Sequence, residues 1–284
     1  MNRQISYPST FAALALVSAA SVMPVSGEEQ KPYEDFASAK FSNPTKIANP
    51  WFPLEPGTRQ VWEGTTVDEE GVVEPHRVVF VVTDLTKVIG GVETRVNWDR
   101  DYKDGELEEA EIVFFAQAND GTIWHLGQYP EEYEDGKINA TPGWLHGING
   151  HAGIMMPADP KLGDPEFSQG WAPNVPWTDR AMVHKTGVKV ETGYGTFEDV
   201  IVFAEHDREE PNARQYKYYA RGVGNIKIGF SGDDTTQEQM ELISVEKLSE
   251  EELAEVRKEA RRIEANAVKF LPEIFGKVEP AQQR

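Results

Sequence analysis

Apolar and polar residues alternate along positions 91–129, and this pattern predicts three consecutive antiparallel strands. Their approximate ranges are 92–102, 106–118 and 122–128, and the pairs Asp104–Gly105 and Asp120–Gly121 separate them. Asp-Gly between alternating runs is typical of a tight hairpin, because a type I′ turn needs positive φ at both central residues. The stretch therefore predicts a three-stranded meander.

The turns also predict which side chains share a face of this meander. A two-residue loop at Asp104–Gly105 would pair Arg100 with Glu109 and Trp98 with Glu111. Strict alternation would place on one face Trp98, Arg100, Glu109, Glu111, Val113, Phe115, Trp124, Leu126 and Gln128, with His125 on the other. Neither face is cleanly polar, so we expect the sheet to curl around a lined cavity rather than to be covered on both sides.

The rest of the chain extends this sheet and ends in a helix. Further strands are predicted at about 60–67, 73–84, 181–191, 197–204, 214–220, 225–230 and 239–247. The pattern from Ser249 to Glu252 is a capping box, and apolar residues at three- and four-residue spacing continue to Phe270. The predicted fold class is all-β with one C-terminal helix: a curled antiparallel meander forming a barrel or half-barrel, with a long irregular insertion at 129–180.

The N-terminus has the pattern of a secretory signal peptide. Arg3 precedes an apolar run at 11–25, and small residues at 26–27 precede two glutamates. A membrane anchor is the alternative, but the run is short and Pro24 interrupts it. We therefore expect a periplasmic or secreted protein with a signal peptide at 1–27, a linker or loosely docked arm at 28–48, one β domain at 49–247, and the helix and tail at 248–284.

Composition excludes several classes of site and partner. The chain has no cysteine, so disulfides and thiolate chemistry are excluded. Its formal net charge of -20 disfavours nucleic acid and anionic membranes as partners. No stable membrane insertion is expected after removal of the signal, and the favoured partner is a small-molecule or ion ligand.

Three segments resemble a family of exported bacterial β-rich proteins. They are Asn-Pro-Trp-Phe-Pro-Leu at 49–54, Gly-Ile-Met-Met-Pro-Ala-Asp-Pro-Lys-Leu-Gly-Asp at 153–164 with Asp-Gly-Thr-Ile-Trp at 120–124, and Tyr-Tyr-Ala-Arg-Gly-Val-Gly at 218–224. The resemblance spans about 49–247. It implies a β half-barrel or barrel with a long insertion, and it implies no activity.

The predicted cavity face carries the candidate ligand-binding residues. Paired carboxylates with aromatic platforms suit a carbohydrate or another small molecule, although Arg100 and Glu109 could equally form a cross-strand ion pair. His125 is either a general base or a half-buried histidine satisfied by hydrogen bonds. The candidate ligand-binding set is Trp98, Arg100, Glu109, Glu111, Trp124, His125 and Gln128.

A glycine-rich loop suggests a second kind of site. His146 and His151 could share a divalent metal ion there, with Asp159, Asp164 or Asp179 supplying oxygen. The alternative is that the two histidines cap backbone groups. No cofactor other than such a metal is indicated, because phosphate-loop, dinucleotide and nucleophile-elbow motifs are absent.

Three hypotheses about function follow. The leading one is an exported protein that binds a small molecule or ion in a β-barrel cavity. The second is a metal-dependent hydrolase or lyase that uses His146, His151 and an aspartate. The third is an envelope interaction protein that uses the terminal helix. The residues leave open whether the protein is an enzyme.

Overall fold

The computed structural model describes residues 32–68 and 70–284. The predicted signal peptide at 1–27 lies outside the described residues, as does the first part of the predicted linker. The strands are β1 (Thr58–Val67), β2 (Val73–Ile89), β3 (Val92–Lys103), β4 (Glu106–Gln117), β5 (Ile123–Glu134), β6 (Lys137–Ala140), β7 (Trp144–Leu145), β8 (His151–Met156), β9 (Phe167–Ser168), β10 (Gly170–Trp171), β11 (Arg180–Glu191), β12 (Thr196–His206), β13 (Ala213–Ala220), β14 (Gly224–Gly232), β15 (Gln239–Lys247) and β16 (Gln282–Gln283). A 3-10 turn, η1, covers Phe36–Ser38, and the helices are α1 (Glu250–Phe270) and α2 (Pro272–Phe275).

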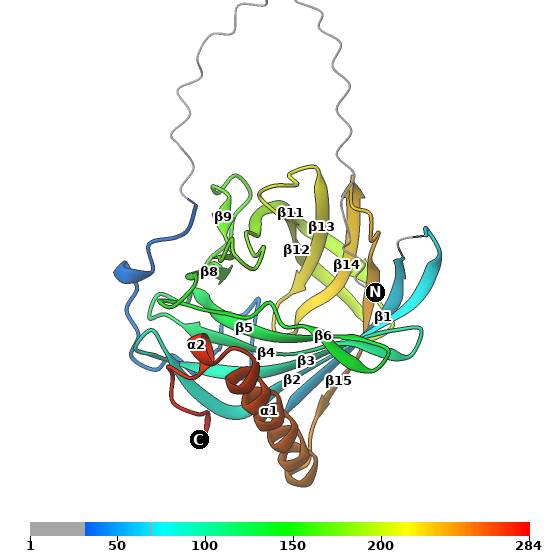
Figure 1. Cartoon of the computed structure of the whole chain (residues 1–284). Helices are drawn as coiled ribbons and strands as arrows, with labels where there is room; N and C mark the ends of the chain where they lie inside the picture. Colours follow the sequence, from blue (N-terminus) through cyan, green and yellow to red (C-terminus); the bar gives the residue numbers. More distant parts are fainter. Residues whose placement is uncertain (1–31, 69) are drawn as a thin grey trace, which may run out of the picture. The chain divides into compact units, whose positions relative to one another are not determined.

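The strands form one antiparallel sheet that curls until its ends meet (Figure 1). Its order is β10-β8-β5-β4-β3-β2-β1-β15-β14-β13-β12-β11-β9. The end strands β9 and β10 are consecutive in the chain and are separated only by Gln169. The sheet is thus a nearly closed barrel, and the predicted fold class is confirmed. The insertion expected to be irregular contains the short strands β6 to β10.

Two β-bulges change the predicted registers of the central meander. Between β3 and β4 the register shifts beside Asp101, so that Asp101 pairs with Glu109 and Arg100 pairs with Ala110. The predicted pairing of Arg100 with Glu109 is therefore wrong, because a bulge adds one residue to one strand and strict alternation beyond it fails. The pairing of Trp98 with Glu111 is wrong for the same reason, since Trp98 lies opposite Ile112.

The second bulge lies between β4 and β5. Phe114 pairs with Gly127 and Phe115 pairs with His125, so Leu126 is the additional residue. Gly127 has φ of +143°, a backbone conformation that L side chains rarely adopt. The residues of β5 that precede the bulge, Trp124 and His125 among them, therefore face the side of the sheet opposite to the one that strict alternation predicts.

Helix α1 covers one face of the sheet, where it packs on β2, β4 and β5 (Figure 1). Ser249 and Glu252 form the predicted capping box. The buried apolar stripe of the helix comprises Leu253, Val256, Ala260, Ile263 and Ala267. The opposite face of the same strands lines the interior of the barrel, so every strand in this wall contributes one face to the helix side and the other to the cavity.

The described part of the predicted linker or docked arm, residues 32–48, lies against the sheet. The amide of Ser42 donates to Asn119 at 2.8 Å, and the amide of Gln117 donates to the carbonyl of Pro44 at 2.8 Å. Phe36 packs edge-on against Trp124, with ring centroids 5.1 Å apart. Among the described helices, none is both long enough and apolar enough to cross a membrane.

Candidate ligand-binding site

The interior of the barrel contains a cavity of about 490 Å³. This volume is in the range of pockets that enclose small organic molecules. Its apolar lining includes Phe52, Trp62, Val78, Phe80, Val113, Phe115, Met155 and Ile228. Its polar lining includes Gln60, His76, Asp99, Asp101, Glu109, Glu111, His125, Gln128, Gln215, Lys217, Asn225 and Glu238. The cavity therefore has a large apolar surface and a concentrated group of charged side chains.

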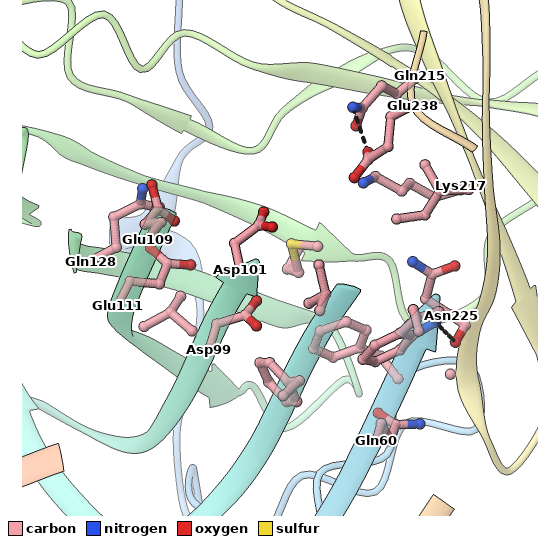
Figure 2. A pocket seen from close by; sticks show the side chains of 18 of the residues that line it. Gln60, Asp99, Asp101, Glu109, Glu111, Gln128, Gln215, Lys217, Asn225 and Glu238 are labelled. Atoms are coloured by element: carbon pink, nitrogen blue, oxygen red, sulfur yellow. Dashed lines mark hydrogen bonds between the residues drawn. The ribbon is translucent and has the colours of Figure 1, made fainter. Parts of the chain in front are cut away.

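Four of the lining residues form a carboxylate quartet: Asp99, Asp101, Glu109 and Glu111 (Figure 2). Asp99 lies directly opposite Glu111 on the neighbouring strand, and Asp101 lies directly opposite Glu109. Directly opposed side chains in an antiparallel pair have Cβ atoms about 4.5–5.5 Å apart, and like charges there are destabilising. The first bulge creates this arrangement, because it replaces the expected Arg100–Glu109 pair with two acidic pairs.

The quartet has few partners to neutralise it. Asp101 is paired with His76, and Asp99 accepts a hydrogen bond from the amide of Arg100 at 2.9 Å. The carboxylates of Glu109 and Glu111 make no ion pair or hydrogen bond to any other described residue, and Oε2 of Glu111 is buried. Two carboxylates thus face the cavity without a protein partner among residues 32–68 and 70–284.

Burial and mutual repulsion raise the pKa values of these acids. Burial raises the pKa of Asp99 to about 7, and the nearby charge of Asp101 adds to the effect. Burial, followed by the charges of Asp99, Asp101 and Glu132, raises the pKa of Glu109 to about 8. Burial and then the charge of Glu109 raise the pKa of Glu111 well above its usual range. At neutral pH the quartet is therefore partly protonated.

The opposite wall carries a mixed group of polar side chains (Figure 2). Gln215 donates to Glu238 at 2.8 Å, and Glu238 lies 3.2 Å from Nδ1 of His76. Burial lowers the pKa of His76, but the carboxylates of Asp101 and Glu238 outweigh it and raise that pKa to about 9. A charged His76 thus links Asp101 of the quartet to Glu238. Lys217 makes no ion pair with the described residues.

His125 and Gln128, two of the candidate ligand-binding residues, lie in the cavity wall. The ring nitrogens of His125 lie 3.2 Å from the carbonyl oxygens of Gln169 and Gly127. Burial lowers the pKa of His125 to about 4, so its imidazole is neutral at pH 7. A neutral imidazole has one N–H, so His125 can donate to only one of these two carbonyls.

Trp98, Arg100 and Trp124 do not line the cavity. Trp98 and Trp124 are part of the hydrophobic core on the face that carries α1. The guanidinium of Arg100 lies 4.0 Å from the centroid of the Trp98 ring. The bulges account for this placement, and they remove both aromatic platforms on which the carbohydrate hypothesis depended. The cavity instead contains Trp62 and Trp177.

The three residues predicted to hold a metal have separate partners. Nδ1 of His146 accepts from the amide of Ala152 at 3.0 Å, and His151 stacks on Tyr33 with ring centroids 3.8 Å apart. Asp179 lies in another hollow, beside Glu205 and Asp207, where burial and these charges raise its pKa to about 7. Within residues 32–68 and 70–284, no group of three or more His, Asp or Glu side chains has an arrangement that could hold a metal.

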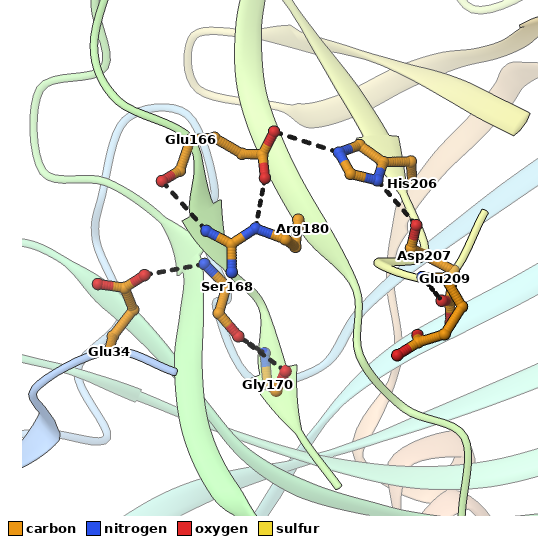
Figure 3. Close-up of polar contacts among 8 residues, drawn as sticks. All are labelled: Glu34, Glu166, Ser168, Gly170, Arg180, His206, Asp207 and Glu209. Atoms are coloured by element: carbon orange, nitrogen blue, oxygen red, sulfur yellow. Dashed lines mark hydrogen bonds and ion pairs between the residues drawn. The ribbon is translucent and has the colours of Figure 1, made fainter. Parts of the chain in front are cut away.

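A polar network surrounds the end strand β9 and its neighbour β11 (Figure 3). Glu166 is paired with Arg180, and Nε2 of His206 lies 3.2 Å from the same carboxylate. The amide of Ser168 donates to Glu34 at 2.9 Å. These contacts hold β9 against β11 and attach the N-terminal arm to the same edge.

Sequence reasoning missed several lining residues, above all Asp99, Asp101, His76, Lys217 and Glu238. Strict alternation from the Asp104–Gly105 turn places Asp99 on the face opposite to that of Glu109 and Glu111. Neither β3 nor β4 contains a glycine that would mark the first bulge, on which the facing of these residues depends. The second bulge did have a signal, because Gly127 interrupts an apolar strand and an internal glycine often marks a bulge. The residues from β2, β13 and the β14–β15 connection carry no local pattern that connects them with the quartet.

No protein-family model and no curated protein matches the sequence. Two solved structures are similar in fold. A protein from Bacteroides fragilis NCTC 9343, described as exported and of YmcC-like fold, is 14% identical over 69% of this chain and 99% of its own, with a TM-score of 0.40. A protein from Parabacteroides distasonis ATCC 8503, described as a lipoprotein, is 12% identical over 70% of this chain and 99% of its own, with a TM-score of 0.40.

Proposed function

We propose that this protein is exported and binds a small molecule in the interior cavity. The observation that supports the proposal is a cavity of about 490 Å³ that combines apolar walls with carboxylates lacking a protein partner. Buried polar groups in folded proteins almost always have a partner, so groups without one in a cavity are suited to a ligand. The raised pKa values of Asp99 and Glu109 mark the same place as a candidate site.

The two alternative functions have less support. A metal-dependent hydrolase or lyase would need His146, His151 and Asp179 to share one ligand set, whereas each has its own surroundings in the structure. An interaction protein that uses the terminal helix would need a free apolar stripe, whereas the stripe of α1 is buried against the sheet.

A cavity-filling substitution tests the proposal. Val78 lines the cavity, and Val88 on the same strand is 49% exposed. Val78→Phe should lower the affinity for a neutral fluorescent apolar probe such as N-phenyl-1-naphthylamine by about tenfold, because the added ring occupies the space. Val88→Phe is the matched control and should bind the probe like the unmodified protein.

The probe titrations are followed by native mass spectrometry of the exported protein. A co-purifying mass that is present in the control and lost in Val78→Phe would support the proposal. Equal probe binding and equal adducts in both variants, with unchanged circular dichroism, would show that the cavity is not a binding site.

A further inference from the structure

We propose that the ligand of the cavity is an amphipathic organic cation, with an ammonium or amidinium group at the carboxylate quartet and an apolar body along the opposite part of the lining. This inference rests on the proposed function, since it names the class of molecule that the cavity accepts. Two observations support it: carboxylates of the quartet have no hydrogen-bond or ion-pair partner, and the remaining walls of the cavity are largely apolar.

The quartet is accompanied by a polar side chain that also lacks a partner. Gln128 is only 8% exposed and lines the cavity, yet its amide makes no hydrogen bond with any described residue. It lies opposite Val113, the next residue after Glu111 on the cavity face of β4. Glu111, Glu109 and the amide of Gln128 therefore lie together on one wall of the cavity (Figure 2). Ionised carboxylates only accept hydrogen bonds, and the amide of Gln128 offers at most two donors, so ionised Glu109 and Glu111 have room for further donors, of which an ammonium supplies three.

The protein's own cations compensate only part of the charge of the quartet. His76 is shared between Asp101 and Glu238, and Lys103 is paired with Glu108 at 2.5 Å. Lys217 belongs to the opposite wall, where it faces the quartet across the cavity (Figure 2). A ligand cation placed at Glu109 and Glu111 would offset the like-charge repulsion that the sheet now contains.

The other walls indicate an organic cation rather than a metal ion. The lining contains Trp62, Phe80 and Ile228, and the apolar side chains there would be left in contact with water by a bare ion. No arrangement of described carboxylates or imidazoles could enclose a metal. A molecule with an alkyl or aromatic body would bury this surface, while its charged end satisfied the quartet.

Cation binding at this site is coupled to protons. Burial raises the pKa of Asp99 to about 7 and that of Glu109 to about 8, so part of the quartet is protonated in the empty cavity. A cation favours the ionised carboxylates and thus releases protons. Lys217 on the opposite wall repels a cation. His76 is protonated below its pKa of about 9 and pairs with Asp101 and Glu238. Affinity for a cation should therefore increase from about pH 6 to about pH 9.

Calorimetric titration with n-octylamine and 1-octanol tests the inference, since the two probes share an alkyl chain and differ in charge. At about pH 8.5 octylamine should bind about tenfold more tightly than octanol, because only the amine makes charge-assisted hydrogen bonds. In a double variant with Glu109→Gln and Glu111→Gln, the preference should fall below about threefold while octanol affinity is unchanged. Glu106→Gln, an exposed residue of the same strand, should retain the preference.

The outcomes separate this inference from the proposed function. Equal binding of the two probes, or a preference that survives in the double variant, would overturn the organic cation while leaving a cavity that binds small molecules. Competition of calcium ions with octylamine would point to a metal site and would also overturn it. If neither probe binds, and Val78→Phe also leaves dye binding unchanged, the proposed function fails as well. Circular dichroism and thermal unfolding verify that each variant is folded.

Discussion

At the scale of single residues, the site depends on acidic side chains in an environment that disfavours their charge. Glu109 and Glu111 could have formed ordinary cross-strand ion pairs, but each faces another carboxylate instead. Such an arrangement lowers the stability of the fold, and conflicts between local chemistry and stability are expected at functional sites. The sequence identified both glutamates and Gln128 as candidates. It did not identify Asp99 and Asp101, because the bulge between β3 and β4 determines which side of the sheet they face.

The stability of the empty protein should decrease with rising pH, in part through Glu109. Its folded pKa of about 8 lies above the ordinary carboxyl value, so the folded state holds a proton that the unfolded state releases. The contribution of this proton to the free energy of unfolding is complete below the unfolded pKa, near 4.5. It decreases as the pH rises and is lost above about pH 8. Glu109→Gln should therefore be more stable than the unmodified protein by about 2 kcal/mol at about pH 9, and equally stable at about pH 4.

Urea unfolding at the two pH values measures this difference. Glu106→Gln is the control, because its exposed side chain should show no such dependence on pH. A Glu109→Gln variant that is no more stable at high pH would mean that Glu109 is ionised at little cost in the folded protein.

At the scale of elements, the two bulges determine what each strand presents to the cavity. The turns, the strands and the helix cap follow local rules that are readable in the sequence. A bulge is different, because one additional residue reverses the facing of every side chain beyond it. This reversal places Trp98, Arg100 and Trp124 on the helix side of the sheet and brings Asp99 and Asp101 into the cavity.

Gly127→Ala should show how strongly the second bulge depends on glycine. A Cβ atom at this position would lie 2.3 Å from the carbonyl oxygen of Trp144, and φ is +143°. The substitution should cost about 3 kcal/mol of unfolding free energy. Gly136→Ala is the matched control: its φ is also positive, at +67°, but no atom lies within 4 Å of the added Cβ. It should cost about 1 kcal/mol. Chemical denaturation compares the two, and equal losses would show that the contact with Trp144 is unimportant.

At the scale of the whole molecule, the curled sheet is held by closure at one place and by the helix at another. Gln169 joins the end strands, and its amide donates to the carbonyl of Asp179 at 2.8 Å. On the helix side, Lys87 and Glu264 form an ion pair of 2.5 Å in which both side chains are at least nine-tenths buried. Glu264 also accepts from the amide of Ala281 at 2.9 Å, which attaches the C-terminal tail.

Lys87→Met should weaken the docking of the helix. The substitution leaves the carboxylate of Glu264 buried without its cation, and breaking a buried pair in this way costs about 3 kcal/mol. Lys258→Met removes one member of an exposed i,i+3 pair on the same helix and should cost less than about 0.5 kcal/mol. Thermal unfolding of the two variants provides the comparison. Similar melting temperatures would indicate that Glu264 is protonated or hydrated when Lys87 is absent.

The sequence by itself determined the fold class, the hairpins, the capped helix and the most acidic strand of the cavity, because these follow from periodicity and turn chemistry among neighbouring residues. Only the tertiary structure decided which faces meet. Lys217 and Glu238 come from distant parts of the chain, and strand curling brings them opposite the quartet, whereas His76 lies on β2 beside the strand that carries Asp101. The same holds for His146, His151 and Asp179, which local spacing suggested as partners and the fold placed among different neighbours. Contacts across a barrel depend on register and curvature, and neither quantity is encoded within a single strand.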